Sequence, residues 1–353
     1  MNFIENTIKK IKDPCNSMYH NAKQRLRQQA RPAGSLGVLE EIAARLSGIF
    51  NTLNVRLQNK IIITCAGDHG VCEEGVSVFT PEVTRQMVCN FLEGGASINV
   101  LARHAGAKVV VADLGVNYSF DPCLPILHKK IGKGTANFTK GPAMTYDDAI
   151  KSIEAGIAIV KQLHDKDHIH LIGTGDMGIG NTTPSSAIIA VFSGLCVDQL
   201  TGKGAGVDND GLKRKIEVIK QGISVNKPDR NNPVDVLAKV GGFEIGGIAG
   251  IVIGAASNGI PVVCDGFIST AGALIACELA PAAKKYLFAG HNSVEAGHRY
   301  MLDYLGLEAL LDLKFRLGEG TGAALSMELI DAATRILFEI KTFQEVEIQD
   351  TQK

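Results

Sequence analysis

The sequence has no tryptophan, and none of its eight cysteines forms a C-x-x-C pair. Scattered single cysteines in a chain of this size indicate reduced, mostly buried thiols of a cytoplasmic protein. An excess of charge is also missing, because 36 basic residues are offset by 37 acidic ones and the net charge is −1. Nothing in this balance supports binding to nucleic acid or to an anionic membrane.

Long hydrophobic runs are missing as well. The longest apolar stretch, I-G-G-I-A-G-I-V-I-G-A-A at 245–256, is rich in glycine and too short to cross a bilayer. It predicts a helix buried inside a globular domain. The first residues, M-N-F-I-E-N-T-I-K-K-I-K, lack the apolar core of a signal peptide, so we expect a cytoplasmic protein without membrane attachment.

Short β-branched runs alternate with helix-length segments along most of the chain. This alternation predicts an α/β class, a Rossmann-like layered fold with a mostly parallel sheet of about six strands. The segments 1–50 and 325–353 lack strand patterns, so we expect them to pack as a small helical domain beside a large domain at 51–324. The expected strands lie at 61–70, 109–115, 169–175, 260–266, 286–291 and 311–320.

Each expected strand brings an acidic residue or histidine, beside a glycine, to its carboxyl end. Ligands of parallel α/β sheets bind outside the carboxyl ends of the strands, so six such ends in series predict one shared pocket. The polar residues are Asp68 with His69, Asp113, Asp176, Asp265, His291 and Glu319.

The stretch G-T-G-D-M-G at 173–178 fits the dinucleotide pattern G-x-G-x-x-G, with Asp198 about twenty residues beyond it. However, the pattern falls in the middle of the chain, and Asp198 follows an expected helix end, not a strand. A second turn, T-G-K-G-A-G at 201–206, leads into a helix with Lys213, Arg214 and Lys215 near its start. Two glycine turns, a basic helix start and a helix N-terminus near Thr182 favour a phosphate monoester over NAD.

Two other phosphate signatures are missing. No Walker lysine motif for a nucleoside triphosphate is present. The paired acidic residues that phosphoribosyl-diphosphate enzymes carry after an apolar strand are also missing, because V-V-V-A-D-L-G offers one acid.

Several motifs occur together in one order: R-P-A-G-S-L-G-V-L-E-E-I-A, A-G-D-H-G-V, E-G-V-S-V-F-T-P-E-V-T-R-Q-M-V, G-D-M-G-I-G-N-T-T, A-G-H-N-S-V-E-A-G-H and L-G-E-G-T-G-A-A. From about residue 31 to about 340 the chain resembles the nicotinate-nucleotide–dimethylbenzimidazole phosphoribosyltransferase family. The resemblance implies a transfer of ribose 5-phosphate from nicotinate mononucleotide to an aromatic base, with inversion at C1′. It also implies a homodimer. The leaving pyridinium is neutralised on departure, so we expect that no metal and no other cofactor is needed.

The resemblance carries residue roles to matching positions. It makes Glu319 the catalytic base, and it places Asp176 in the site where the family has glutamate, so a chemical or only a binding role for Asp176 stays open. Nucleotide and phosphate binding falls to Gly175, Gly178, Asn181, Thr182, Thr183, Gly202, Gly204, Lys215 and Ser293. Base binding falls to Ser77, Phe79, Gln86, Met177 and Leu317.

Alternatives remain open at the level of the sequence. The accepting base can be a benzimidazole, a purine or a phenol, and a phenol-using enzyme can need a partner subunit. A metal-dependent hydrolase would use Asp68, His69, Asp113, Asp265 and His291 as a metal ring. A nucleotide sensor without chemistry is the third alternative, against which Glu319 in L-G-E-G-T-G speaks.

Overall fold

The computed structural model describes residues 2–347, in which seven parallel strands form one sheet in the order β3-β2-β1-β4-β5-β6-β7. This confirms the parallel α/β fold, and the order is that of a doubly wound sheet. The strands are β1 (Lys60–Gly67), β2 (Ala107–Gly115), β3 (Leu127–His128), β4 (Leu171–Met177), β5 (Val262–Cys264), β6 (Leu287–His291) and β7 (Ala309–Leu311).

Two strand predictions need correction. The two-residue edge strand β3 was missed, because it lies in a long loop without a β-branched run. The last strand, β7, ends at Leu311, so 312–320, which the sequence pattern assigned to a strand, is a loop that reaches the next helix.

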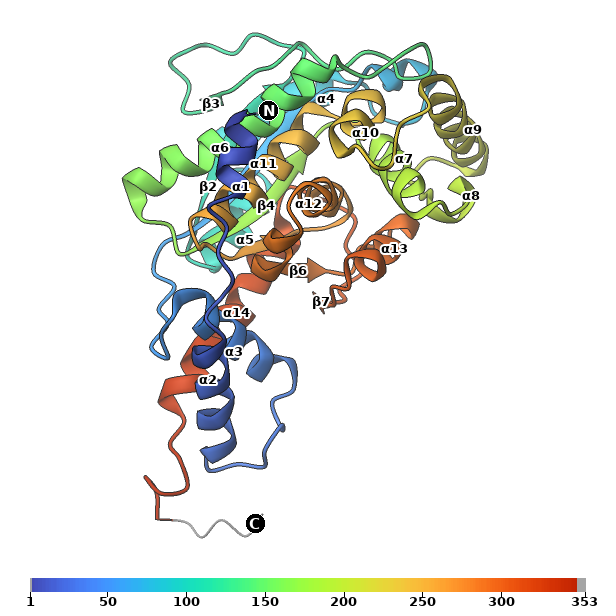
Figure 1. Cartoon of the computed structure of the whole chain (residues 1–353). Coiled ribbons are helices and arrows are strands. Elements are labelled where there is room, and N and C mark those ends of the chain that lie inside the picture. Colours follow the sequence, from blue (N-terminus) through green and yellow to red (C-terminus); the bar gives the residue numbers. More distant parts are fainter. Residues whose placement is uncertain (1, 348–353) are drawn as a thin grey trace.

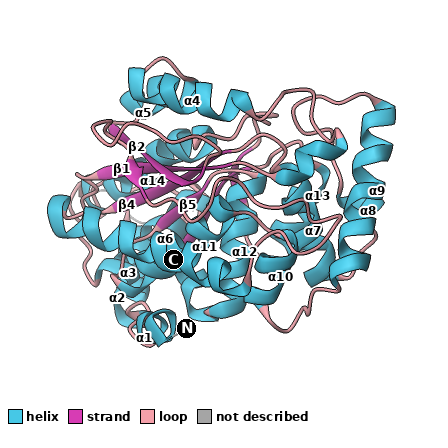
Figure 2. Cartoon of the chain, turned by 90° about the horizontal axis from the view of Figure 1, so that it is seen from above, coloured by secondary structure: helices cyan, strands magenta, loops and turns pink. Residues whose placement is uncertain are grey.

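Helices cover both faces of the sheet, as Figure 2 shows from above. Helices α6, α11 and α12 pack on one face, and α4, α5 and α14 on the other. The described helices are α1 (Asn2–Ile8), α2 (Asn16–Gln28), α3 (Val38–Phe50), α4 (Glu82–Glu93), α5 (Ser97–His104), α6 (Tyr146–Asp167), α7 (Thr182–Ser193), α8 (Val197–Leu200), α9 (Asn209–Asn226), α10 (Pro233–Val240), α11 (Phe243–Ser257), α12 (Phe267–Leu279), α13 (Ala296–Leu305) and α14 (Thr321–Glu339), with short 3-10 turns η1 (Gly70–Glu74) and η2 (Pro281–Tyr286).

The two ends of the chain meet beside the sheet. Helices α2 and α3 pack with the far end of α14 and project from the α/β body (Figure 1), and Gln29 pairs with Thr342. Helix α1 packs instead against α6 and α11, with Ile4 in the core of the α/β body. The division into domains at residues 50 and 325 stays a prediction.

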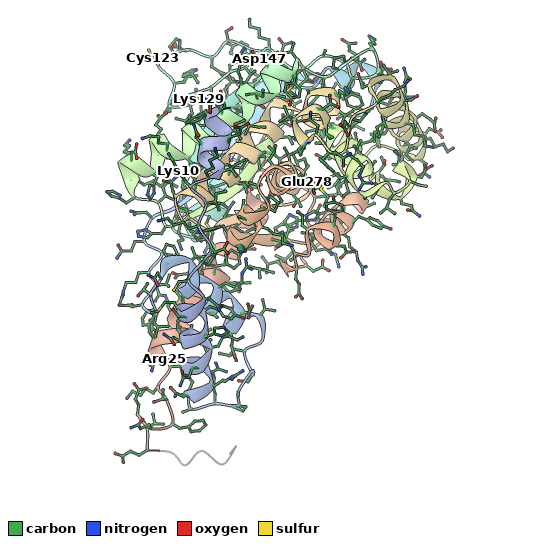
Figure 3. All side chains as sticks on the ribbon, in the orientation of Figure 1. Lys10, Arg25, Cys123, Lys129, Asp147 and Glu278 are labelled. Atoms are coloured by element: carbon green, nitrogen blue, oxygen red, sulfur yellow. The ribbon has the colours of Figure 1, made fainter. Side chains whose placement is uncertain are left out.

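The thiols are less buried than expected. All eight cysteines are free, three are buried, three are half-buried, and Cys123 and Cys196 are exposed. Cys123 lies in the loop before β3, at the outer edge of the molecule (Figure 3). The expectation of mostly buried thiols is therefore wrong.

Helix α11 is the apolar stretch that the sequence placed inside the protein, and the structure buries it from Phe243 to Ala256. Its glycines let the backbone of α6 approach directly. A Cβ atom added to Gly156 would lie 2.0 Å from the carbonyl oxygen of Gly247, and one added to Gly250 would lie 1.9 Å from that of Ile153. Among the described residues, no helix is long and apolar enough to cross a membrane.

Gly250→Ala should therefore destabilise the protein by about 1–3 kcal/mol, because the two helices must move apart. In an unobstructed helix the same change stabilises by about 0.5–1 kcal/mol. Denaturant unfolding measures the difference. Gly141→Ala, where no atom lies within 4 Å of the added Cβ, is the control and should leave the free energy of unfolding within about 1 kcal/mol. A stabilised Gly250→Ala protein would contradict the helix contact.

Candidate active site

Two adjoining cavities open at the carboxyl ends of the strands. They share a wall made by Met177, Ile179, Ala205, Arg316 and Leu317. The strand order reverses between β1 and β4, and doubly wound sheets bind their ligands at that crevice. The polar cavity is further lined by Val76, Ser77, Asp176, Gly178, Gly180, Asn181, Thr182, Gly204, Gly266, Phe267, Ile268, His291, Ser293, Glu295 and Gly318. The apolar cavity is further lined by Phe79, Val83, Met87, Ser97, Leu101, Lys314, Phe315, Glu319 and Thr321.

Glu319 lies on a turn of unusual backbone conformation. Gly318, Glu319 and Gly320 have φ angles of 86°, 66° and 101°, so a glutamate occupies the left-handed region between two glycines. A non-glycine residue there costs about 1 kcal/mol or more and persists only where its surroundings fix it. The fixing contacts come from two strands: Thr64 on β1 donates to the Glu319 carbonyl at 2.9 Å, and the Glu319 N–H donates to the Asp176 carbonyl at 3.1 Å.

The glycines of G-T-G-D-M-G make room for this turn. A Cβ atom on Gly175 would lie 2.2 Å from the carbonyl oxygen of Glu319, and one on Gly178 would lie 2.3 Å from that of Gly67. The pattern that resembles a dinucleotide motif thus meets a packing requirement between β4 and its neighbours. Asp198, its supposed ribose ligand, instead forms an exposed ion pair with Lys220 at 3.1 Å.

Asp265 at the end of β5 fixes the other side of the turn. Its carboxylate accepts hydrogen bonds from the N–H groups of Gly320, Gly322 and Ala323, at 3.1, 2.6 and 3.1 Å. These groups belong to the first turn of α14, where a carboxylate is favourably placed against the helix dipole. Asp265 is therefore a structural residue that positions Glu319.

The Glu319 side chain borders the apolar cavity and is only 5% exposed. Its Oε2 accepts a hydrogen bond from the Ile98 N–H at 3.1 Å, at the start of α5. Burial raises the pKa of Glu319, and the Ile98 N–H opposes part of that shift. A buried carboxylate with a raised pKa, beside an apolar space, suits a general base near neutral pH.

Asp176 at the end of β4 borders the polar cavity. Its Oδ2 accepts a hydrogen bond from Asn181 Nδ2 at 3.0 Å, and its Oδ1 is buried without a partner among the described residues. Burial, reinforced by the charge of Asp265, raises the pKa of Asp176 well above its ordinary value. A carboxyl group with one free oxygen can exchange a hydrogen bond with a hydroxyl group in the cavity.

The two glycine turns meet at Lys215. Its ammonium group is buried and donates to Thr182 Oγ1 at 2.5 Å and to the Gly202 carbonyl at 3.3 Å. Burial lowers the pKa of Lys215 to about 8. The neighbouring Lys213 and Arg214 lie outside this contact: Lys213 pairs with Asp210, and Arg214 contacts the Gly75 carbonyl.

Helix α7 begins at Thr182, near the helix N-terminus that the sequence predicted. Its N-cap is Asn181, so Thr182 and Thr183 are helical and Pro184 is the third helical residue. The Thr183 N–H donates to the Gly180 carbonyl at 3.0 Å, and Pro184 has no N–H. The positive end of the helix dipole still lies at the polar cavity beside Thr182, which makes this end suitable for an anion.

Two residues of the site were missed at the level of the sequence, although both lie within or beside quoted motifs. Glu295 is 6% exposed, and its Oε1 accepts the Gly204 N–H at 2.9 Å. Its main-chain N–H donates to Ser293 Oγ at 3.3 Å, while the Ser293 N–H donates to His298 Nδ1 at 2.9 Å. Arg316 directly precedes L-G-E-G and lines both cavities.

The expected base-binding residues do not all line the same cavity. Phe79, Met177 and Leu317 line the apolar cavity, with Phe79 and Leu317 more than half exposed at 51% and 55%. Ser77 lines the polar cavity, and Gln86 is exposed on α4 and lines neither. Among the expected phosphate residues, Gly175, Thr183, Gly202 and Lys215 lie behind the cavity walls.

The six strand ends do not form one ring. Asp113 pairs with Lys130 at 2.7 Å, and Asp68 accepts the Asn117 N–H at 2.7 Å. His69 forms a buried contact with Glu244, also at 2.7 Å. Within the described part of the chain, no three His, Cys, Asp or Glu side chains are grouped to hold a metal ion, so the metal ring expected for the hydrolase alternative is not formed there.

Comparison with known proteins finds relatives along nearly the whole chain. The sequence pattern of a family described as phosphoribosyltransferase matches residues 11–348. A nicotinate-nucleotide–dimethylbenzimidazole phosphoribosyltransferase of Geobacter sp. (strain M21) is 53% identical over 345 residues, which are 98% of this chain and 99% of the relative. One from Chloroflexus aurantiacus is 47% identical over 99% of both chains.

A solved structure extends the agreement to the fold. The nicotinate-nucleotide–dimethylbenzimidazole phosphoribosyltransferase of Thermus thermophilus is 42% identical, covers 95% of this chain and 99% of its own, and superposes with a TM-score of 0.90. The chain therefore belongs to the nicotinate-nucleotide–dimethylbenzimidazole phosphoribosyltransferase family.

Proposed function

We propose that this protein transfers ribose 5-phosphate from nicotinate mononucleotide to 5,6-dimethylbenzimidazole. The products are α-ribazole 5′-phosphate and nicotinate, with inversion at C1′. The observation that carries the proposal is Glu319, a buried carboxylate fixed on a left-handed turn at the border of the apolar cavity. Family membership supports the same reaction.

The proton balance of the reaction requires such a base. One ring nitrogen of the benzimidazole attacks C1′, and the other nitrogen loses its proton to Glu319. The bond from C1′ to the pyridine nitrogen breaks, and its electron pair neutralises the pyridinium charge. The leaving group departs as neutral-ring nicotinate, so the proposal needs neither a metal nor another cofactor.

The phosphate end of the substrate fits the polar cavity. Thr182 and the N-terminus of α7 offer hydrogen-bond donors, and Lys215 adds a positive charge directly behind Thr182. Asn181, Ser293 and Gly204 complete this end. The ribose then lies at the boundary between the two cavities. Its hydroxyl groups lie near Asp176, and its C1′ atom faces Glu319.

The choice of base is a separate part of the proposal. The apolar cavity, about 820 Å³ in volume, is large enough for a flat bicyclic ring, and few polar side chains line it to select one base over another. A purine or a phenol would also place an acidic N–H or O–H near Glu319. A panel of these bases, offered with nicotinate mononucleotide, ranks them directly by product formation.

Glu319→Gln should lower kcat by about 10²–10⁴-fold, the usual contribution of a positioned general base. The change keeps the side-chain shape, so the protein should fold normally. Chromatography with mass spectrometry measures nicotinate release and the α-ribotide. The matched control is Glu328→Gln, a half-exposed glutamate in the middle of α14 that pairs with Lys60 at 3.6 Å, which should keep full activity. A Glu319→Gln enzyme within threefold of the parent would contradict the role, and no product from any base would contradict the function.

The pH profile of kcat/KM should be bell-shaped. Glu319 accepts a proton only when ionised, and its raised pKa shifts the acidic limb above the ordinary glutamate range. Lys215 carries its charge only below its pKa of about 8, so phosphate binding should weaken above that pH. With nicotinate riboside, which has no phosphate, the acidic limb should remain and the alkaline limb should disappear. An unchanged alkaline limb would argue against Lys215 as the phosphate cation.

A cytoplasmic homodimer completes the proposal and rests on the resemblance to the family. Analytical ultracentrifugation should give twice the 37.5 kDa mass of the chain. A monomer that gains activity on addition of a different subunit would instead favour the paired-subunit alternative.

A further inference from the structure

Arg316 is a cation at the boundary of the two cavities, on the loop between β7 and α14. It lines both cavities, and it precedes Glu319 by three residues. One of its donors, Nη1, forms a hydrogen bond with the Gly204 carbonyl at 3.2 Å. This bond joins the loop at 312–318 to the second glycine turn and holds the guanidinium over the shared wall.

The guanidinium has free capacity. Arginine carries five N–H donors, and one of them is engaged by Gly204. Among the described residues Arg316 forms no ion pair, although the adjoining Lys314 pairs with Asp312 at 2.8 Å. The fork of an arginine matches a carboxylate with two parallel hydrogen bonds.

The charges of the substrate and of the site can be matched. Nicotinate mononucleotide carries two anionic groups, the phosphate and the ring carboxylate. The polar cavity is lined by two acids, Asp176 and Glu295, which repel both groups when ionised, while buried Lys215 stands behind Thr182 at the phosphate end. Lys314 also lines the apolar cavity but is paired with Asp312, so among the described residues Arg316 is the lining cation that has no ion pair and can meet the second anion.

We propose that Arg316 binds the ring carboxylate of the pyridine and thereby selects nicotinate mononucleotide over its amide. The inference rests on the proposed function, because it assigns the second anion of that substrate. It makes Arg316 a specificity-determining residue beside the base Glu319.

The same contact assists departure of the pyridine. A free carboxylate donates electron density to the ring and makes its nitrogen a poorer leaving group than that of the amide. Two hydrogen bonds from a guanidinium withdraw this density, so the bound nicotinate leaves more readily. Loss of Arg316 should therefore lower kcat as well as raise KM for nicotinate mononucleotide.

The test is a pair of selectivity ratios, measured for the parent enzyme and for Arg316→Met with one fixed base. The parent should prefer nicotinate over nicotinamide mononucleotide, and Arg316→Met should reduce this ratio of kcat/KM about 10- to 100-fold, the range for a lost charge-assisted hydrogen bond. The ratio for nicotinate mononucleotide over nicotinate riboside should stay within about threefold. Arg316→Lys, which keeps the charge without the fork, should lie between the two.

The control is Lys220→Met, which removes a cation on α9 that lines neither cavity and is already paired with Asp198. It should leave the carboxylate ratio unchanged. The inference is overturned if the parent does not discriminate against the amide, or if Arg316→Met changes the phosphate ratio instead. An equal loss on all substrates would also overturn it, because Arg316 would then only hold the two loops together.

A binding measurement separates this inference from the proposed function. Calorimetry with free nicotinate and free nicotinamide needs no turnover. Nicotinate should bind the parent and lose about 10- to 100-fold in affinity in Arg316→Met, while nicotinamide should not respond. If no base yields product but this dependence is found, the transferase reaction fails and the carboxylate site stands. If nicotinate binding is absent or unaffected, the carboxylate site fails whatever the turnover.

Discussion

The hydrogen bonds between the Asp265 carboxylate and the start of α14 are the interaction on which the geometry of the site depends. By accepting three N–H groups, those of Gly320, Gly322 and Ala323, the carboxylate sets where α14 begins. Glu319, two residues before the first helical residue Thr321, is thereby held in a left-handed conformation that glutamate rarely adopts by itself. Burial of Asp265 raises its pKa, and His291 and the three N–H groups act in the opposite direction. An ionised Asp265 is thus favoured by the contacts that position Glu319.

Glycine supplies the space that this arrangement requires. Gly175 lies under the Glu319 carbonyl, and Gly178 under that of Gly67, so neither position has room for a side chain. Strand β4 therefore meets two demands at once. It packs closely against the Glu319 turn, and it places Asp176 at the polar cavity. The second demand explains why an acidic residue lies between glycines that close packing requires.

The sequence predicted the fold well, because strand runs and helix periods are local signals. It located five of the seven strands and the buried helix α11, and it placed Asp176 at a strand end. It wrongly placed Glu319 at a strand end, because this residue lies eight positions beyond β7, just before α14. It missed β3 and the early end of β7, because short edge strands and loops have no periodic pattern. It also could not separate Lys215 from Lys213 and Arg214, since burial of one lysine is decided by tertiary packing against Thr182.

The six strand-end residues show the same limit. Their common position predicted a shared pocket, but Asp113 and His69 find partners inside the protein. Which acidic side chain pairs with which basic one depends on how the connecting loops fold back over the sheet. No local sequence pattern encodes that path. Glu295 and Arg316 were overlooked for the related reason that they lie off the strand ends, on the loops that close the cavities.

The wall between the two cavities is built mainly from loop residues, whereas the proposed catalytic and phosphate-binding side chains are fixed by strands and helices. Glu319 shares a loop with Arg316 and Leu317, but hydrogen bonds to β1 and β4 fix its backbone. Asp176 and Lys215 lie on β4 and α9, whereas the wall residues Ala205, Arg316 and Leu317 belong to connecting loops. Loops tolerate substitution and insertion with little loss of stability. Evolution can therefore exchange one acceptor for another by altering the loops while proton removal and phosphate anchoring are inherited intact. A single ancestral scaffold could in this way give rise to enzymes with divergent acceptors.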